Sequence, residues 1–251
     1  MKLHFVKYQA TGNDFVLLDN RSKTIDLSID QIKKICDRRF GIGADGLMLI
    51  EKHPTLDFNL VYYNSDGSQS LCGNGSRAAV KMASSLGMVN GKASFNAFDG
   101  RHDAVLNEAV IKVKMNDVTV PADSDFINTG SPHYLQFVSD LKNFPVFEEG
   151  RRIRYARNAN TNFIELLPDN AIYVRTYERG VENETLSCGT GVTAAALAAS
   201  FKGYRSPVAI KTLGGDLSVE FTAQSSGHTV TFRDIFLIGP AKMVFEGDLE
   251  L

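Results

Sequence analysis

Short stretches rich in apolar residues occur in both halves of the chain, and in some of them apolar and polar residues alternate with the period of two that is typical of β-strands. Turn-forming residues at 65–67, 168–170 and 214–216 separate some of these stretches. The pattern predicts strands at residues 15–18, 58–63, 110–115, 163–167, 171–177, 217–221 and 229–232.

Three longer stretches predict helices, at about residues 29–39, 74–86 and 190–201. The last two are rich in alanine and end near Gly87 and Gly203, as helices with a glycine cap do. Small side chains let strands approach a helix closely. We therefore expect an α+β fold of two pseudo-symmetric domains, each a mostly antiparallel sheet wrapped around a central helix.

Residues 71–87 (LCGNGSRAAVKMASSLG) and 187–203 (SCGTGVTAAALAASFKG) are two copies of one motif. The copies share Cys, Gly, Gly, Ala, Ala, Ala, Ser and Gly at aligned positions, and each places one thiol, Cys72 or Cys188, at the start of a predicted helix. A duplicated half that contributes one thiol per copy predicts a paired-thiol active site.

The chain of 251 residues, 43% of them hydrophobic, is long enough for one large core or for two domains of roughly 120 residues. The two cysteines lie 188 − 72 = 116 residues apart, which favours two domains. Pro121 and small polar residues at 117–125 indicate a linker. We predict an N-terminal domain at 1–117 carrying Cys72 and a C-terminal domain at 118–240 carrying Cys188. Residues 241–251 are expected to pack back on the first domain.

The charges are balanced and interspersed, with 27 basic and 29 acidic residues and a net charge of −2. This composition gives no broad basic surface for nucleic acid or a membrane. No apolar run approaches the roughly 20 residues that span a bilayer, so a cytoplasmic protein is expected. The remaining partners are a small molecule or another protein chain.

Three cysteines are few for this length, so the thiols are expected to be reduced and not part of a disulfide framework. His4, His53, His102 and His228 show no metal-ligand spacing, and no metal is expected. Cys36 lies at a buried helical position and is expected to be an ordinary core residue.

A thiol at a helix N-terminus lies beside amide N–H groups without partners and the positive end of the helix dipole, which lower its pKa from about 8.5. The following Gly-x-Gly leaves those amides uncovered, so a carboxylate can bind there. Two such helix ends facing each other would place a thiol on each side of one carbon. That arrangement suits a racemase or epimerase.

Two other interpretations of the cysteines remain. A single Cys-Gly-x-Gly can be a buried small residue at a tight turn. Cys72 and Cys188 can also form a redox-switch disulfide. The duplication favours the catalytic interpretation over both.

Polar residues flank several predicted strands. Asn13 precedes one strand, Asn64 follows another, and Asn160 precedes a third in an echo of the Asn13 segment. Each can also be a turn residue. Glu178 and Arg179 end a strand, either as an ion pair in solvent or with Arg179 holding a substrate carboxylate.

Six motifs together resemble the diaminopimelate epimerase family, and the resemblance runs over residues 5–245. They are GNDFV at 12–16, RFGIGADG at 39–46, NSDGS at 64–68, CGNGSR at 72–77, YERG at 177–180 and TLSCGTG at 185–191. In that family two pseudo-symmetric domains close over LL-diaminopimelate. Two cysteines invert one α-carbon to the meso form, without pyridoxal phosphate or metal, for lysine and peptidoglycan precursor synthesis.

The resemblance implies a role for each matching residue. Cys72 and Cys188 would be the acid/base pair, and His133, in a loop, and Glu178 would tune their pKa values. The substrate would be bound by Asn13, Asn64, Gly73, Asn74, Asn160, Glu178, Arg179, Gly189 and Thr190. Of these, Gly73, Asn74, Gly189 and Thr190 would be helix-end donors to the reacting carboxylate. The resemblance also implies a homodimer.

Three positions depart from the family pattern. Gly46 stands where the family often has glutamine, Ser131 where it has asparagine, and Phe245 where it has a dimer-interface tyrosine. A related two-cysteine racemase of proline, hydroxyproline or histidine is therefore an alternative. A non-catalytic binding or redox-sensing protein on the same scaffold is a second one.

Overall fold

The computed structural model describes residues 2–107 and 110–251. The chain forms two compact units, one of Met1–Val113 with Pro240–Leu251 (the N-terminal unit) and one of Lys114–Gly239 (the C-terminal unit). The sequence analysis placed the domain boundary at 117/118 and the return of the chain at 241. The units divide at 113/114 and 239/240.

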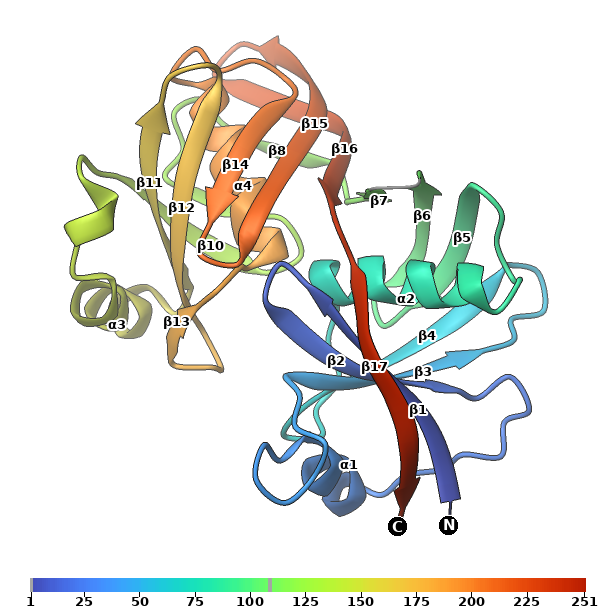
Figure 1. Cartoon of the computed structure of the whole chain (residues 1–251). Coiled ribbons are helices and arrows are strands. Elements are labelled where there is room, and N and C mark those ends of the chain that lie inside the picture. Colours follow the sequence, from blue (N-terminus) through green and yellow to red (C-terminus); the bar gives the residue numbers. More distant parts are fainter. Residues whose placement is uncertain (1, 108–109) are drawn as a thin grey trace. The chain divides into compact units, whose positions relative to one another are not determined.

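The N-terminal unit is a sheet with two helices (Figure 1). Its strands pair in the order β17-β1-β2-β3-β4-β5-β6-β7, antiparallel except for the pairs β2–β3 and β4–β5. The elements are β1 Lys2–Ala10, β2 Asn13–Asp19, α1 Ile29–Cys36, β3 Gly46–Glu51, β4 Phe58–Asn64, α2 Gly73–Ser85, β5 Lys92–Ala97, β6 Gly100–Leu106, β7 Ile111–Lys114 and β17 Lys242–Glu250.

The C-terminal unit has the same plan. Its strands pair in the order β9-β10-β11-β12-β14-β15-β16-β8, with β13 also paired to β12, and the parallel pairs are β10–β11 and β12–β14. The elements are β8 Val118–Pro121, β9 Phe126–Asn128, β10 Pro132–Phe137, the 3-10 helix η1 Leu141–Asn143, α3 Val146–Arg157, β11 Asn160–Leu167, β12 Ala171–Glu178, β13 Asn183–Thr185, α4 Gly189–Ser200, β14 Val208–Thr212, β15 Gly215–Ser226 and β16 Thr229–Gly239.

The two units repeat one order of strand pairing. From β1 to β7 the successive pairs are antiparallel, parallel, antiparallel, parallel, antiparallel and antiparallel, and the pairs from β9 to β16 follow the same sequence. In this alignment α2 corresponds to α4 and α1 to α3. The predicted α+β fold of two pseudo-symmetric, mostly antiparallel sheets is confirmed.

Each central helix is packed by its small side chains against its own sheet. In α2, Ala78, Ala79 and Ala83 are fully buried among strand residues, and α4 is buried along nearly its whole length. Gly87 and Gly203 have φ of 71° and 90°, a left-handed conformation that glycine adopts without strain and that ends each helix as predicted. Figure 1 shows strands of each unit passing along its central helix.

Three expectations about secondary structure are wrong. The first helix ends at Cys36, not at 39, because Asp37 is extended (ψ 126°). Helix α3 was not predicted. The predicted linker at 117–125 contains strand β8, in which buried Val118 and Val120 alternate with exposed residues and which pairs with β16.

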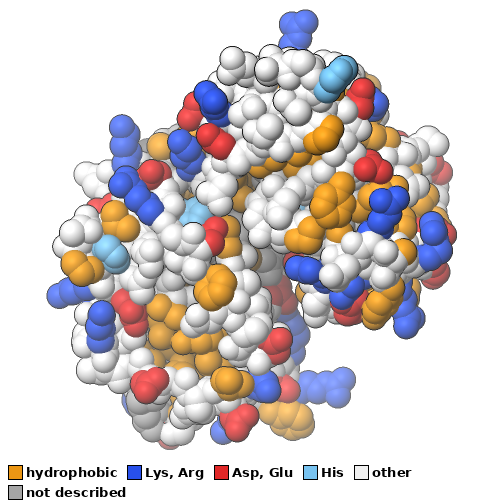
Figure 2. Space-filling model, turned by 180° about the vertical axis from the view of Figure 1, so that it is seen from behind, with side chains coloured by type: hydrophobic (Ala, Val, Ile, Leu, Met, Phe, Trp, Pro, Cys, Tyr) orange, Lys and Arg blue, Asp and Glu red, His pale blue; other side chains and the backbone are white. Residues whose placement is uncertain are grey.

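The outer surface carries both signs of charge. On the face drawn in Figure 2, Lys and Arg side chains are mixed with Asp and Glu side chains. Across the described ranges, no helix combines the length and the hydropathy that crossing a bilayer requires.

Candidate functional site

Cys72 is the N-cap residue of α2, as predicted. Its extended backbone (φ −127°, ψ 109°) starts the helix, and its Sγ accepts a hydrogen bond from the N–H of Gly75 at 3.3 Å. The N–H groups of Gly73 and Asn74 belong to the first turn, where a helix supplies no acceptor. A Cβ at Gly75 would lie 2.3 Å from Met48 Cε and 3.4 Å from Cys72 Sγ, so a side chain here would require the end of Met48 to move.

Asn13 contacts both Cys72 and Asn74 through one oxygen atom. The Oδ1 of Asn13 lies 3.6 Å from Cys72 Sγ and accepts a hydrogen bond from Asn74 Nδ2 at 3.4 Å. The Nδ2 of Asn13 donates to Asp45 at 2.6 Å, which fixes the orientation of this amide with its oxygen toward the thiol.

The sequence analysis missed the charged cluster that holds Asn13. Arg38 bridges Asp45 (2.7 Å) and Asp14 (2.6 Å), and Lys7 pairs with Asp14 at 2.7 Å. Burial alone would raise the pKa of Asp14, but hydrogen bonds from Arg38 and Lys7 outweigh it and lower the pKa to about 2. These four side chains come from segments that are distant in the sequence, so no local pattern indicates that they meet.

Asn64 lies apart from the Cys72 contacts. It ends β4 and its Nδ2 donates to Ser68 Oγ at 3.0 Å and to Ser70 Oγ at 3.2 Å, the arrangement of a turn residue. The described contacts of Asn64 therefore hold the turn that follows β4.

Cys188 is the N-cap residue of α4 and is 6% exposed. Its Sγ lies 3.6 Å from Thr190 Oγ1, and Thr190 is the second residue of the helix after Gly189. A Cβ at Gly191 would lie 2.3 Å from Asn162 Oδ1 and 3.3 Å from His133 Cε1. Both copies of Cys-Gly-x-Gly therefore start a helix, and in both a Cβ at the second glycine would lie close to a neighbouring side chain.

His133 lies beside this helix start, in strand β10 and not in a loop as predicted. Its Nδ1 accepts from Asn162 Nδ2 at 3.0 Å, because the oxygen of that amide already accepts from Thr176 at 2.9 Å. Its Nε2 therefore carries the proton and faces Thr190 Oγ1 at 2.9 Å. Complete burial, together with the charge of Arg179, lowers the pKa of His133 to about 3, so the imidazole is neutral near pH 7.

Asn160, Ser131 and Arg179 extend this network. Asn160 Nδ2 donates to Ser131 Oγ at 3.1 Å, and its Oδ1 accepts from the backbone N–H of Arg179 at 2.9 Å. Ser131 Oγ lies 3.0 Å from His133 Nε2. The Arg179 side chain is exposed and Glu178 accepts from Thr185 at 2.9 Å. These residues come together at one end of the C-terminal sheet.

The expected echo between Asn160 and Asn13 is wrong. His133 pairs with Asn160 across β10 and β11 as Phe15 pairs with Gly46 across β2 and β3, so the repeat matches Asn160 to Gly46. The same register matches Asn13 to Ser131. The sequence analysis also missed Asn162, although it stands two residues from Asn160 and therefore on the same face of β11.

Comparisons with known proteins place the chain in a family. The sequence profile described as "Diaminopimelate epimerase" matches residues 5–120 and 126–244. A protein named diaminopimelate epimerase from Flavobacterium psychrophilum is 47% identical over 259 residues, covering 98% of this chain and 99% of that protein. The chain belongs to the diaminopimelate epimerase family. A protein of the same name from Aquifex aeolicus is 37% identical and covers 98% of each chain.

Solved structures show the same fold at lower identity. A phenazine biosynthesis protein of the PhzF family from Bacillus anthracis superimposes with a TM-score of 0.75 at 14% identity, over all of both chains. A probable proline racemase from Agrobacterium radiobacter gives a TM-score of 0.72 at 14% identity, over 99% of this chain and 93% of the other.

The three departures from the family pattern have structural surroundings. A Cβ at Gly46 would lie 2.4 Å from a ring carbon of Tyr62 and 2.7 Å from its hydroxyl, so the tyrosine fills the space of a side chain there. Ser131 contributes its hydroxyl to the His133 network in place of an amide. Phe245 is 45% exposed and makes an edge contact with Phe5, at 5.9 Å between ring centroids.

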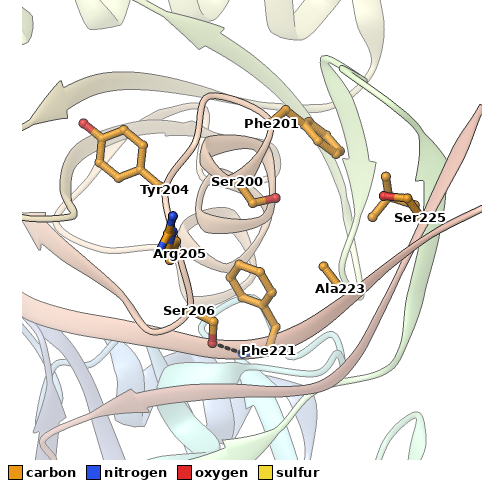
Figure 3. A pocket seen from close by; sticks show the side chains of 9 residues that line it. Ser200, Phe201, Tyr204, Arg205, Ser206, Phe221, Ala223 and Ser225 are labelled. Atoms are coloured by element: carbon orange, nitrogen blue, oxygen red, sulfur yellow. Dashed lines mark hydrogen bonds between the residues drawn. The ribbon is translucent and has the colours of Figure 1, made fainter.

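A hollow of about 350 Å³ lies elsewhere in the C-terminal unit. Its lining includes Ser200, Tyr204 and Phe221, and Ser206 Oγ accepts from the N–H of Phe221 at 2.8 Å (Figure 3). Ser200 is the last residue of α4, whereas Cys188 caps its start, so the hollow lies at the other end of the helix from the thiol. Among the residues the structure describes, no three His, Cys, Asp or Glu side chains are grouped to hold a metal ion.

Proposed function

We propose that the protein interconverts LL-diaminopimelate and meso-diaminopimelate with Cys72 and Cys188 as the two acid/base groups, without pyridoxal phosphate or metal. The observation that carries the proposal is the repeated N-cap: in a chain of this family, each unit places one cysteine at the start of its central helix, next to a Gly-x-Gly turn.

In the proposed reaction each of the two thiols acts on a different face of one α-carbon of the substrate. The thiolate of one cysteine removes the α-proton, and the thiol of the other delivers a proton to the opposite face. The configuration inverts, and the protonation states of the two cysteines are exchanged. The reverse reaction uses the same groups with their roles exchanged.

The carbanion formed between these two proton transfers needs strong stabilisation. An amino-acid α-proton is less acidic than a thiol by more than about ten pKa units, which is above about 14 kcal/mol. The substrate carboxylate would accept hydrogen bonds from the N–H groups of Gly73, Asn74, Gly189 and Thr190, at the positive ends of both helices. Donors that are fixed before the reaction begins need no reorganisation.

The neighbouring side chains would stabilise the thiolate and bind the distal end of the substrate. Neutral His133 donates toward Thr190, which lies against Cys188, so the pair can stabilise a thiolate there without adding a charge. Glu178 would adjust the field at the same thiol. Arg179 would hold the distal carboxylate of the substrate bidentately, together with Asn13, Asn64 and Asn160.

We also propose a homodimer that works in the cytoplasm, in lysine and peptidoglycan precursor synthesis. Three adjacent residues of β17, Met243, Val244 and Phe245, are exposed by 49%, 57% and 45%. An exposed apolar row of this kind on a strand is suited to burial against a second copy of the chain. Neither nucleic acid nor a membrane is expected as a partner.

The proposal is tested by incubating the protein with LL-diaminopimelate in deuterated water without added cofactor. Deuterium should enter one α-carbon, and this incorporation should be lost in both Cys72→Ala and Cys188→Ala. Cys36→Ala is the matched control, because Cys36 is a buried core residue whose pKa is raised by burial to about 11. It should retain turnover.

Two results would overturn parts of the proposal. Exchange with proline or hydroxyproline but none with diaminopimelate would reject the substrate. Turnover that survives removal of either Cys72 or Cys188 would reject the two-thiol mechanism.

A further inference from the structure

A cationic side chain is buried on α2, the helix that Cys72 caps. Arg77, on α2, is fully buried and its guanidinium donates to three neutral oxygen atoms. Nε donates to the carbonyl of Pro240 at 3.3 Å, and Nη2 donates to Thr11 Oγ1 at 3.2 Å and Asn74 Oδ1 at 3.0 Å. Nη1 is buried and has no hydrogen-bond partner in the described part of the chain.

Arg77 is thus a buried charge that forms no ion pair with a carboxylate of the described residues. Burial lowers its pKa to about 10, which leaves it protonated at neutral pH, and the charge that acts against this effect is that of Cys72. Buried charges are costly without a counter-charge. The thiolate of Cys72 is the counter-charge available.

The other ionisable side chains near α2 do not supply the buried positive charge that Arg77 provides. On the helix side of the sheet lie Tyr8, whose pKa is raised by burial, Tyr62, and His102, which pairs with Asp99 at 2.7 Å. On α2 itself the other cation is Lys81, which is partly exposed. Lys7, Arg38, Asp14 and Asp45 form the balanced cluster beyond Asn13.

The corresponding position of the second motif carries no charge. Thr193 aligns with Arg77, is fully buried, and its hydroxyl donates to the carbonyl of Gly189 at 2.9 Å. The side chains around Cys188 are neutral His133 and Thr190, with Glu178 and exposed Arg179 farther along the network. The buried cation therefore belongs to the Cys72 half of the repeat.

We propose that Arg77 is a positioning residue for Cys72: it supplies a fixed buried positive charge that stabilises the thiolate form of this cysteine. The proposal rests on the acid/base role of Cys72 given above. The thiol form can donate to Asn13 Oδ1, and the thiolate form accepts from the N–H of Gly75 in the field of Arg77. Arg77 also orients Asn74, and through it Asn13, by its bond to Asn74 Oδ1.

The test measures the pKa of Cys72 from the pH dependence of its alkylation by iodoacetamide in a Cys36→Ala/Cys188→Ala background. Alkylation requires no diaminopimelate, so its outcome is independent of the proposed substrate. Arg77→Gln should raise the pKa of Cys72 by about one unit or more and slow alkylation at pH 7 about tenfold. Arg77→Lys, which keeps the charge, should leave the pKa within about half a unit.

The matched control is Cys188, measured in a Cys36→Ala/Cys72→Ala background, where Arg77→Gln should leave the pKa unchanged. An unchanged Cys72 pKa in Arg77→Gln, or equal shifts in the Gln and Lys variants, would show a structural role only and overturn the proposal. If Arg77→Gln does not fold, the thiolate absorbance of the parent single-cysteine protein decides: a Cys72 pKa at or above about 8.5 overturns the proposal.

Discussion

Adding one methyl group at Gly191 tests how tightly the Cys188 half is packed. In Gly191→Ala the new Cβ would lie 2.3 Å from Asn162 Oδ1, so the amide must move by about 1 Å to reach an ordinary contact. Its hydrogen bonds to Thr176 (2.9 Å) and His133 (3.0 Å) would then exceed bonding distance. Thus the substitution should damage the orientation of His133.

The expected cost follows from these contacts. Overpacking a buried site costs about 1–3 kcal/mol, and leaving buried polar groups without partners costs about 1–3 kcal/mol. Replacing a helical glycine with alanine stabilises the helix by about 1 kcal/mol, which offsets part of this cost. We expect Gly191→Ala to lower the free energy of unfolding by about 1–5 kcal/mol. Turnover should fall as well.

Gly75→Ala is the matched control, because it adds the same methyl group at the same position of the other motif. There the first obstacle is Met48 Cε, also at 2.3 Å, the mobile end of a flexible side chain. Its unfolding free energy should change by less than about 1 kcal/mol. Urea denaturation followed by far-UV circular dichroism compares the two variants. Equal losses, or a larger loss in Gly75→Ala, would refute the packing argument.

Three further predictions concern charge and assembly. Folding lowers the pKa of Asp14 to about 2, so the stability it contributes is present above about pH 4 and is lost as the pH falls toward 2. Asp14→Asn, which cannot ionise between Lys7 and Arg38, should lack this acid-dependent loss in urea titrations at pH 5 and pH 3. Folding also lowers the pKa of His133 to about 3, so its contribution to stability declines as the pH drops from about 6.5 toward 3. Nitrogen NMR should find the neutral Nε2–H imidazole at pH 5, and an imidazolium there would contradict the burial argument. Phe245→Glu should convert the proposed dimer to a monomer in sedimentation, and an unchanged mass would place the interface elsewhere.

The positions of both thiols could be predicted because their determinants are local. In both copies a cysteine followed by Gly-x-Gly and a run of small residues indicates a helix start, and Cys72 and Cys188 are both N-cap residues. The place of Asn13 at the start of β2 could be predicted for the same reason, because it stands just ahead of the apolar run at 15–18. Some predicted strands, such as β12, have one buried face and alternate in the sequence, whereas β2 was visible as a run of apolar residues that is buried on both faces.

The rest depended on contacts between distant segments. Helix α3 buries Val146, Gly150 and Ile153 at helical spacing, but charged residues dilute the pattern, it begins without a side-chain cap, and it ends at left-handed Asn158 and not at a glycine. Asn162 reads as an ordinary strand residue until β10 places His133 beside it. No local signal distinguishes a buried arginine from an exposed one, so the sequence does not predict that Arg77 is buried.

The pairing of β17 with β1 has a consequence for biosynthesis. The C-terminal unit is one continuous stretch, and all of it has been synthesised once Gly239 has been added. The N-terminal unit begins with β1 but obtains the antiparallel neighbour of that strand from Lys242–Glu250, near the end of the chain. During translation the half that is made first is therefore the half that is completed last, and a ribosome that stops before Lys242 leaves β1 with an open edge.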